Sequence, residues 1–530
     1  MAHRKWFLSL ILIVAGAVIL KAVLLAADVI PFNADEAVVA LMARHILEGE
    51  RPWFFYGQAY MGSLDAYLIA GAFALLGESV LAVRLVQVVL FALTVFTWAI
   101  VAYRFTGDRK TALVATLLLA FPSVLITLYT TVTLGGYGEA LLIGNLLLWW
   151  GHRLGTEDES RLWLWALWGI AGGIGFWTLG ISLVYLVPMA LWLLWRLRAK
   201  AWKGYIVAIV AFALGSSPWW LGNRGKIVVG IGELLGFAIL STSTAETFPG
   251  NVQLRLFNLL LFGLTGLMGL RYPWRALPAM PILAIPTLAV YLGILGYNVI
   301  KCLGGRHHIN AVVWGIWATL LTGFLLTPFG GDPSGRYFLP LSITLTLFTA
   351  QAWSALKERI GHWSWLIIGL ILVFNIASTA NAAWHSPPGI TTQLGPITQI
   401  DHRYDDDLIA FLTDINQQYG YTNYWVTYPI AFHSNEEVIL LPRLSYKSNL
   451  EYTSRDDRYT PYGERVEDSQ RVVYVTTNHR ALDRRIRSEL QRHGVTFEER
   501  QIGSYHVFHD LSQKITPDQL DIYQKEDESE

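Results

Sequence analysis

The sequence has few charged residues and a single cysteine. Charged residues make up 15% of its 530 residues and hydrophobic residues 53%, whereas soluble globular proteins carry about 25% charged residues. The chain therefore lacks the polar surface that would cover it in water. Its one cysteine, Cys302, excludes an internal disulfide and a thiol metal cluster. Basic and acidic residues balance at 40 each, so net charge favours no nucleic-acid partner.

Long apolar runs are what the sequence has instead. A bilayer core requires roughly 20 apolar residues in a helix, and about eleven runs of this kind predict a mainly α, polytopic transmembrane bundle. The runs are 6–27, 81–103, 111–130, 134–151, 161–179, 181–195, 204–221, 277–299, 309–328, 337–355 and 363–383. No small-residue cleavage site follows the first run, so we expect an uncleaved first span.

The composition changes near residue 384. We predict a transmembrane domain over 1–384 and a small C-terminal α/β domain over 385–530 that ends in a disordered acidic tail. In the second domain, 406–419 and 480–493 predict helices. The segments NYWVTYPIAF, EEVILL, RVVYVTT and YHVFHDL predict strands.

Lysine and arginine in short loops predict the orientation in the membrane. With a cytoplasmic N-terminus, the basic loops at 104–110, 196–203, 301–306 and 357–359 all lie inside. This orientation requires that the apolar stretch 252–270 does not cross the membrane. We interpret the stretch as a re-entrant or interfacial segment. The odd number of spans then places the C-terminal domain outside. We expect a multi-pass protein of the plasma or inner membrane with an extracytoplasmic C-terminal domain.

The first outer loop, residues 28–80, contains a helical pattern. In PFNADEAVVALMARHILEG, apolar residues recur with helical spacing until Gly49, which predicts an amphipathic helix lying in the membrane interface. Asn33 and Glu36 are spaced as an N-cap and its N3 partner, so Glu36 has a sufficient structural explanation. Asp35 projects from the apolar face, where a carboxylate needs a partner or a task. We therefore interpret Asp35 as the functional acid.

A second short helix is predicted at about 63–76, with Asp65 near its start. The segment before it, PWFFYGQAYMG, contains Tyr56, Gln58 and Tyr60. Their side chains suit a polar ring ligand, and aromatic anchoring at the interface explains the two tyrosines equally well.

Several charged residues lie where they cost energy. Lys21, in the outer half of the first span, either snorkels to the interface or neutralises an anionic head group. Glu139 opens the fourth span after LGGYG, where it complements the helix dipole or faces a ligand. Arg84 is also predicted outside and adds positive potential there.

Arg336, followed by Tyr337, is the sharpest of these candidates. It comes after the turn GGDPSG and opens the span RYFLPLSITLTLF on the outer side. A cation there opposes both the helix dipole and the inside bias of basic residues. Guanidinium binds phosphate in a bidentate fork, so we interpret Arg336 as a phosphate ligand, with interfacial snorkelling as the alternative.

Together these residues resemble the GT-C superfamily of membrane glycosyltransferases, in the branch of protein O-mannosyltransferases and aminoarabinose transferases. The matching pieces are NADEAVVALMARHILEGERPWFFYGQAYMGSLDAYL and GRYFLP, and the resemblance covers roughly 1–385. It implies a polyprenyl-phosphate sugar as the donor. It also implies that Asp35 acts at the acceptor, with Glu36 beside it, and that Arg336 lies near the donor phosphate. The tail does not resemble the carbohydrate-binding tails of other members.

We therefore expect an inverting hexosyl- or pentosyltransferase with Asp35 as base and Arg336 on the donor phosphate. A glycan, lipid or protein supplies the acceptor hydroxyl. Asp65 and Glu139 either orient sugar hydroxyls or hold a divalent metal, although no metal-ligand constellation is visible. The alternatives are a lipid-linked saccharide transporter or flippase, a polysaccharide ligase or polymerase, and a non-catalytic scaffold. Charged residues gathered at the outer interface favour an enzyme over a transporter.

Overall fold

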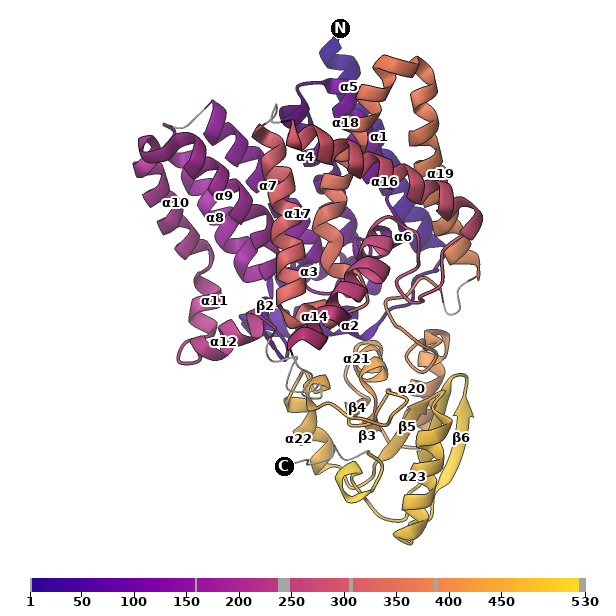
Figure 1. Cartoon of the computed structure of the whole chain (residues 1–530). Helices are drawn as coiled ribbons and strands as arrows, with labels where there is room; N and C mark the ends of the chain where they lie inside the picture. Colours follow the sequence, from indigo (N-terminus) through magenta and orange to yellow (C-terminus); the bar gives the residue numbers. More distant parts are fainter. Residues whose placement is uncertain (1, 158–159, 237–247, 305–307, 386–388, 524–530) are drawn as a thin grey trace.

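The computed structural model describes residues 2–157, 160–236, 248–304, 308–385 and 389–523. Helices form a large bundle, and the C-terminal residues lie beneath it in orange to yellow (Figure 1). The predicted, mainly helical fold is confirmed. The acidic tail at 524–530 lies outside the described residues, and the basic loop at 301–306 is described to residue 304.

The bundle contains most of the helices, which run from the N-terminus to His385. They are α1 (Ala2–Ala26), α2 (Ala34–Glu48), α3 (Leu64–Leu76), α4 (Val80–Thr106), α5 (Arg109–Ala120), α6 (Val124–Tyr129), α7 (Tyr137–Thr156), α8 (Leu162–Thr178), α9 (Leu183–Leu197), α10 (Trp202–Gly215), α11 (Ser217–Gly222), α12 (Ile227–Leu234), α14 (Phe248–Asn258), α15 (Thr265–Leu267), α16 (Pro281–Leu303), α17 (His308–Leu326), α18 (Leu339–Ile360) and α19 (Trp365–His385). A short hairpin of β1 (Phe54–Phe55) and β2 (Gln58–Gly62) precedes α3.

Each of the predicted apolar runs contains helix. Among the described residues, five stretches are long and apolar enough to cross a membrane: Arg4–Ala26, Val80–Thr106, Gly180–Gly215, Pro281–Leu303 and Arg336–His385. The third contains both α9 and α10, and the last contains both α18 and α19. The number of crossings remains a prediction.

The sequence predicted one helical span over 111–130, but the structure has two helices there. α5 ends at Ala120 and α6 begins at Val124. Pro122 lies between them, and its ring disfavours helical geometry in the preceding residue and removes a backbone donor. α5 alone has 12 residues, which is too short to span a bilayer core.

The apolar stretch 252–270 is a helix with a π-helical turn, η3 (Leu259–Leu264), between α14 and α15. It contacts two short turns before α18, namely η4 (Pro328–Gly331) and η5 (Arg336–Phe338). Asn258 Nδ2 donates to the carbonyl of Gly330 at 2.9 Å. The stretch therefore supports the turn that contains Arg336, and whether it crosses the membrane remains a prediction.

The C-terminal region contains a five-stranded sheet in the order β4-β3-β5-β7-β6. Its strands are β3 (Tyr419–Thr422), β4 (Ile439–Pro442), β5 (Val473–Thr477), β6 (Glu498–Ile502) and β7 (Tyr505–His509). β3 runs parallel to β4 and β5, whereas β7 is antiparallel to β5 and β6. The helices are α20 (Asp405–Asp414), α21 (Tyr424–His433), α22 (Pro461–Asp468) and α23 (Arg480–Arg492). The division of the chain at 384–385 remains a prediction.

The segment NYWVTYPIAF is a helix, α21, and not the strand that its aromatic residues predicted. The Asn423 side chain accepts a hydrogen bond from the backbone N–H of Trp425 at 3.0 Å and so caps the first turn. The helix packs on α2, where its bulky residues are buried. Tertiary packing therefore overrides the β propensity of these residues. β3 and β6 were not predicted at all.

α2 has the predicted helical pattern but not the predicted surroundings. It ends at Gly49, which has φ 117° as a left-handed C-cap. α3 and α4 contact it from the bundle, and α21 contacts it from the C-terminal region (Figure 1). Because residues 36–46 are all buried, α2 is covered by protein on both sides and does not lie open at a membrane surface.

Candidate active site

A cavity of about 520 Å³ lies where the bundle meets the C-terminal region. Asp35, from the first turn of α2, and Arg336, from η5, both line it. Further walls come from the turn before Arg336, from residues 392–398 and from aromatic and polar residues of the C-terminal region. The structure therefore brings together the two residues to which the sequence assigned the chemistry.

The Arg336 guanidinium is held from one side. Its Nη2 atom pairs with Asp332 Oδ2 at 2.9 Å, and the group lies over the Tyr337 ring, 5.3 Å from its centroid. Among the described residues, its Nε atom has no hydrogen-bond partner. The preceding Gly335 has φ 83°, a left-handed conformation that suits glycine and turns the chain into η5. Arg336 is therefore positioned by protein contacts and keeps donor capacity for an anion.

The Asp35 carboxylate has a partner from the far end of the chain. The Tyr424 hydroxyl donates to Asp35 Oδ1 at 2.6 Å. Asp35 lies in the first turn of α2, where the helix dipole favours a negative charge. It is half-buried, so the carboxylate is supported by the protein and still accessible from the cavity.

Hydrogen bonds and one cation–π contact link this acid to two more predicted residues, Gln58 and Tyr60. Arg458 donates to the amide oxygen of Gln58 from Nη1 at 2.9 Å and Nη2 at 3.0 Å, and Gln58 donates to the Tyr60 hydroxyl at 3.1 Å. The Arg458 guanidinium also lies over the Tyr424 ring, 5.5 Å from its centroid. Gln58 and Tyr60 are therefore connected to Asp35 through a cation of the C-terminal region.

The C-terminal wall of the cavity is aromatic and polar. Trp425 and Tyr446 meet edge to face at 6.1 Å between ring centroids. In the part of the chain that the structure describes, Trp425 Nε1 is buried without a hydrogen-bond partner. Lys447 also lines the cavity and pairs with Glu451 at 3.1 Å. Sequence reasoning missed this wall, although the aromatic cluster around Trp425 was a signal for it.

A second cavity of about 240 Å³ is almost entirely apolar. Tyr60 and Tyr337 line it together with leucines and phenylalanines of the bundle. The Phe329 ring contacts both tyrosines, at 6.0 Å from Tyr60 and 5.1 Å from Tyr337 between centroids. Since Tyr337 also lies against Arg336, the apolar space begins beside the guanidinium.

Glu36 and Arg84 form a buried ion pair away from the cavity. Arg84 donates to the Glu36 carboxylate from Nε at 3.2 Å and Nη2 at 3.0 Å. The N-cap prediction is confirmed, because Asn33 Oδ1 accepts from the Glu36 N–H at 3.1 Å. Burial raises the pKa of Glu36, and Arg84 opposes that shift. Neither Glu36 nor Arg84 lines the cavity, and their pairing favours a structural role.

Asp65 and Glu139 meet inside the protein. Gln87 Nε2 donates to Asp65 Oδ1 at 2.9 Å, and the Thr133 hydroxyl donates to Oδ2. Burial raises the pKa of Asp65, and these donors oppose the shift. Among the described residues, both oxygens of the neighbouring Glu139 carboxyl are buried without a hydrogen-bond partner. The polar side chains therefore satisfy Asp65 and not Glu139.

Lys21 has no donor left for a ligand. It donates to the carbonyl of Thr127 at 2.6 Å and to the hydroxyls of Thr130 at 2.7 Å and Thr131 at 2.6 Å. An ammonium group has three donors, and these contacts use all of them. The side chain is fully buried, so it does not snorkel to the interface.

Tyr56 belongs to the contact between the first outer loop and the C-terminal region. Its hydroxyl donates to Glu50 Oε2 at 2.5 Å, and its ring stacks on Tyr459 at 4.9 Å between centroids. The Tyr459 hydroxyl donates to the other oxygen of Glu50 at 2.7 Å. Tyr56 therefore joins the two parts of the molecule and does not line the cavity.

Comparison with known proteins supports the same fold. A family model described as dolichyl-phosphate-mannose-protein mannosyltransferase matches residues 63–221. Undecaprenyl phosphate-α-4-amino-4-deoxy-L-arabinose arabinosyl transferases are similar in sequence. The protein from Pseudomonas aeruginosa (strain LESB58) is 30% identical over 172 residues. A second one, from Pseudomonas fluorescens (strain Pf0-1), is 28% identical over 173 residues. Each match covers 30% of this chain and only 30% of the relative's own length.

Two solved structures cover most of the chain. ArnT from Cupriavidus metallidurans bound to undecaprenyl phosphate has a TM-score of 0.61 at 12% identity and covers 94% of this chain and 97% of that chain. The apo oligosaccharyltransferase from Archaeoglobus fulgidus has a TM-score of 0.54 at 12% identity. The match covers 89% of this chain and 69% of that chain. The predicted resemblance to GT-C membrane glycosyltransferases of the aminoarabinose transferase-like branch is confirmed.

The mannosyltransferase family model does not reach the whole candidate site. Residues 63–221 include Asp65 and Glu139, whereas Asp35 and Arg336 lie outside them. The roles of Asp35 and Arg336 therefore rest on the geometry of the cavity in this chain.

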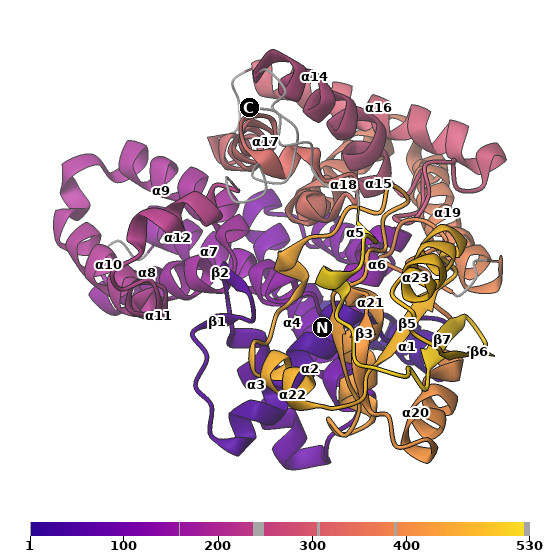
Figure 2. The same ribbon diagram turned by 90° about the horizontal axis from the view of Figure 1, so that it is seen from below.

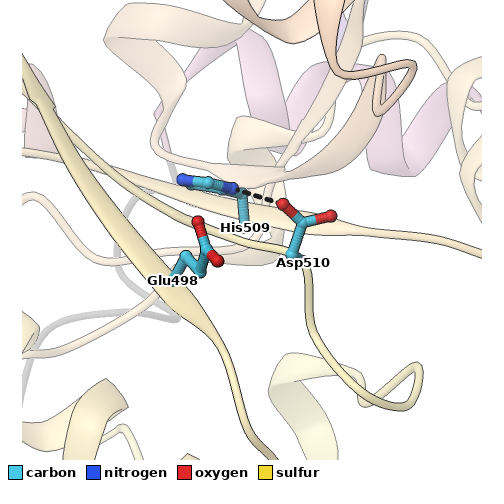
Figure 3. A group of neighbouring side chains, drawn as sticks. All are labelled: Glu498, His509 and Asp510. Carbon is cyan, nitrogen blue, oxygen red and sulfur yellow. Dashed lines mark hydrogen bonds and ion pairs between the residues drawn. The ribbon is translucent and has the colours of Figure 1, made fainter.

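A separate group of possible metal ligands lies in the C-terminal sheet. Within the described residues, it is the one trio of histidine and acidic side chains that come within 4.8 Å of one another. Glu498 on β6 faces His509 on β7, and Asp510 follows directly (Figure 3). His509 Nδ1 already bonds to Asp510 Oδ2 at 2.9 Å, and both acids are exposed. The trio does not line the cavity and takes no part in the proposed chemistry.

Proposed function

We propose that this protein is a membrane glycosyltransferase that moves a sugar from a polyprenyl-phosphate donor to an acceptor hydroxyl. The observation that carries the proposal is the single cavity that contains both Asp35 and Arg336 and adjoins an apolar cavity. The donor class is supported by the names of the sequence relatives and by the undecaprenyl phosphate in the ArnT structure.

The donor phosphate binds at Arg336. Its planar guanidinium suits two oxygens of one phosphate, and Asp332, which also lines the cavity, holds the group in place. The first isoprene units enter the apolar cavity beside Tyr337, and the remaining chain stays in the bilayer. A lipid tail and a charged head group thus each have a complementary surface.

Asp35 acts as the base. It takes the proton of the acceptor hydroxyl while that oxygen forms a bond to the anomeric carbon of the donor sugar. The bond between this carbon and the phosphate oxygen breaks, and its electron pair leaves on the phosphate, whose charge Arg336 stabilises. Attack from the face opposite the leaving phosphate inverts the configuration. Both cavity carboxylates already have protein partners, since Asp332 pairs with Arg336 and Asp35 with Tyr424.

The reaction takes place at the outer face of the plasma or inner membrane. This assignment rests on the distribution of lysine and arginine among the short loops, which favours a cytoplasmic N-terminus and an extracytoplasmic C-terminal region. The C-terminal region lies against one end of the bundle (Figures 1 and 2). The cavity is lined by residues of both parts, and we place it where the bilayer meets water.

The test uses the purified full-length protein in lipid nanodiscs with radiolabelled polyprenyl-phosphate pentoses and hexoses, and cell membranes as the source of acceptor. We expect label to leave the lipid and appear on the acceptor, and Asp35→Asn to abolish transfer while the protein folds normally. Asp28→Asn is the matched control, because Asp28 is an exposed acid of the same loop with φ 48°, which asparagine tolerates. Undiminished transfer by Asp35→Asn would remove it as the base.

The alternatives give different outcomes in the same system. In sealed vesicles, passage of the labelled lipid without cleavage would indicate a flippase. Transfer of label onto a growing polysaccharide would indicate a polymerase or ligase that shares the donor chemistry.

A further inference from the structure

Helix α21 of the C-terminal region contacts Asp35, the candidate base in the bundle. It packs along α2, and its first residue, Tyr424, is 3% exposed. The Tyr424 hydroxyl lies 2.6 Å from Asp35 Oδ1. Among the described residues, this is the one hydrogen bond to the Asp35 carboxylate. A residue nearly 400 positions away thus determines how the candidate base is oriented.

Tyr424 is itself held firmly. Its ring meets Tyr428 edge to face at 5.4 Å, and the Arg458 guanidinium covers it at 5.5 Å. The Arg458 N–H donates to the Tyr428 hydroxyl at 2.5 Å, so the two supports are joined. A phenol in this cage has little rotational freedom, and its hydroxyl stays directed at Asp35.

The phenol acts as a donor and not as a second base. Burial raises the pKa of Tyr424, the charge of Asp35 raises it further, and Arg458 opposes both. The hydroxyl therefore keeps its proton at physiological pH. A protonated phenol can donate one hydrogen bond, which goes to Asp35 Oδ1.

We infer that Tyr424 is a positioning residue for Asp35, which reserves Oδ1 for itself and leaves Oδ2 as the atom that takes the acceptor proton. The inference rests on the proposed function, because it assigns Asp35 the role of base. It gives the C-terminal region a part in catalysis: the acid is oriented only when α21 is docked on α2. Positioning of this kind contributes to kcat because the acceptor hydroxyl must meet one carboxylate oxygen in one geometry.

The docking of α21 has its own contacts. The Phe32 ring, just before α2, meets Phe432 of α21 at 5.4 Å between centroids. Arg44 Nη2 donates to the carbonyl of Phe432 at 3.2 Å, and Nε pairs with Glu78 at 2.8 Å. These contacts lie at the far end of α21 from Tyr424, so removing the Tyr424 hydroxyl leaves them in place.

The experiment compares Tyr424→Phe with Tyr474→Phe in nanodiscs containing the full-length protein. Tyr474 is a suitable control, because its hydroxyl is also buried and donates to the carbonyl of Ile515 at 2.8 Å, but it does not line the cavity. With radiolabelled polyprenyl-phosphate sugar as donor and cell membranes as acceptor, we expect Tyr424→Phe to lower kcat about tenfold at unchanged KM for the donor. Tyr474→Phe keeps both constants.

Three outcomes would overturn the inference. They are an unchanged kcat in Tyr424→Phe, an equal loss in Tyr474→Phe, and a loss in Tyr424→Phe that follows the fraction of unfolded protein in a melting curve. Asp35→Asn distinguishes this failure from failure of the proposed function. If Asp35→Asn is inactive while Tyr424→Phe is normal, only the positioning role fails. If Asp35→Asn transfers sugar normally, the proposed base itself is wrong.

Discussion

The acidic residues near the first outer loop lie in two different surroundings. Asp35 borders a cavity, with one hydrogen bond from Tyr424 and a half-buried carboxylate. Asp65 is buried, with donors from Gln87 and Thr133 and with Glu139 beside it. We call the second group the sealed cluster: Asp65, Glu139, Gln87 and Thr133. An acid whose oxygens are all occupied holds the structure together, whereas an acid with a free oxygen at a cavity can act on a ligand.

Asp35 and Glu36 show the same contrast within one helix turn. Consecutive residues of a helix point about 100° apart, so one acid faces the cavity and the other faces α4. There Arg84 binds Glu36 through two nitrogen atoms. The side of α2 on which an acid lies therefore separates a catalytic candidate from a structural ion pair.

The largest expected effect comes from breaking the Glu36 pair. Glu36→Gln leaves Arg84 as a buried charge without its partner and should lower the free energy of unfolding by about 3 kcal/mol. Thermal melting in detergent measures this loss. Asp35→Asn should change the same midpoint very little, and Glu36→Gln with Arg84→Met should recover most of the loss. Equal destabilisation by Asp35→Asn would erase the contrast between the two acids.

Opening the sealed cluster should have the next largest effect. Asp65→Ala leaves Gln87 and Thr133 without their acceptor, at a cost of about 2 kcal/mol. Glu139→Gln should be nearly neutral, because among the described residues the Glu139 oxygens have no hydrogen bond to lose. Melting curves of the two variants test this difference. If Glu139→Gln proves as damaging as Asp65→Ala, the Glu139 carboxyl also stabilises the fold.

At the cavity, the expected change is in donor binding and not in stability. Arg336→Lys keeps the charge but loses the planar fork and should raise KM for the labelled donor about tenfold. The melting temperature should stay close to that of the unchanged protein. Lys357→Arg at the opposite end of α18 is the control for a basic substitution in the same helix. An unchanged KM for Arg336→Lys would contradict the phosphate role.

The smallest expected effect is a pH dependence near the cavity. Burial raises the pKa of Asp456 from 3.8 to about 7, and Arg458 and Lys447 oppose the shift. The folded state therefore binds a proton above pH 3.8 that the unfolded state has lost, and stability falls as the pH rises towards 7. Between pH 6 and pH 7 the loss should be about 1 kcal/mol. Asp456→Asn should remove this slope from melting curves, and a slope that persists would assign it to another group.

Local rules predicted the helices and their ends well. The apolar runs, the α2 pattern, the Asn33 cap and the Gly49 stop all depend on residues within a few positions of one another. Rules of this kind failed where packing decided the outcome. NYWVTYPIAF has the composition of a strand but is buried against α2 as the helix α21, and Lys21 is satisfied by three threonine residues of another segment.

The sequence by itself predicted the mainly helical membrane fold and pointed to Asp35 and Arg336 as candidate site residues, because apolar length and misplaced charge are visible without coordinates. Only the tertiary structure decided which acids face a cavity. It separated Asp35 from Glu36 and Asp65 and gave Asp35 a partner in Tyr424. Hydrogen bonds and ion pairs depend on distances of a few ångströms between residues that are far apart along the chain, and these distances exist only after folding.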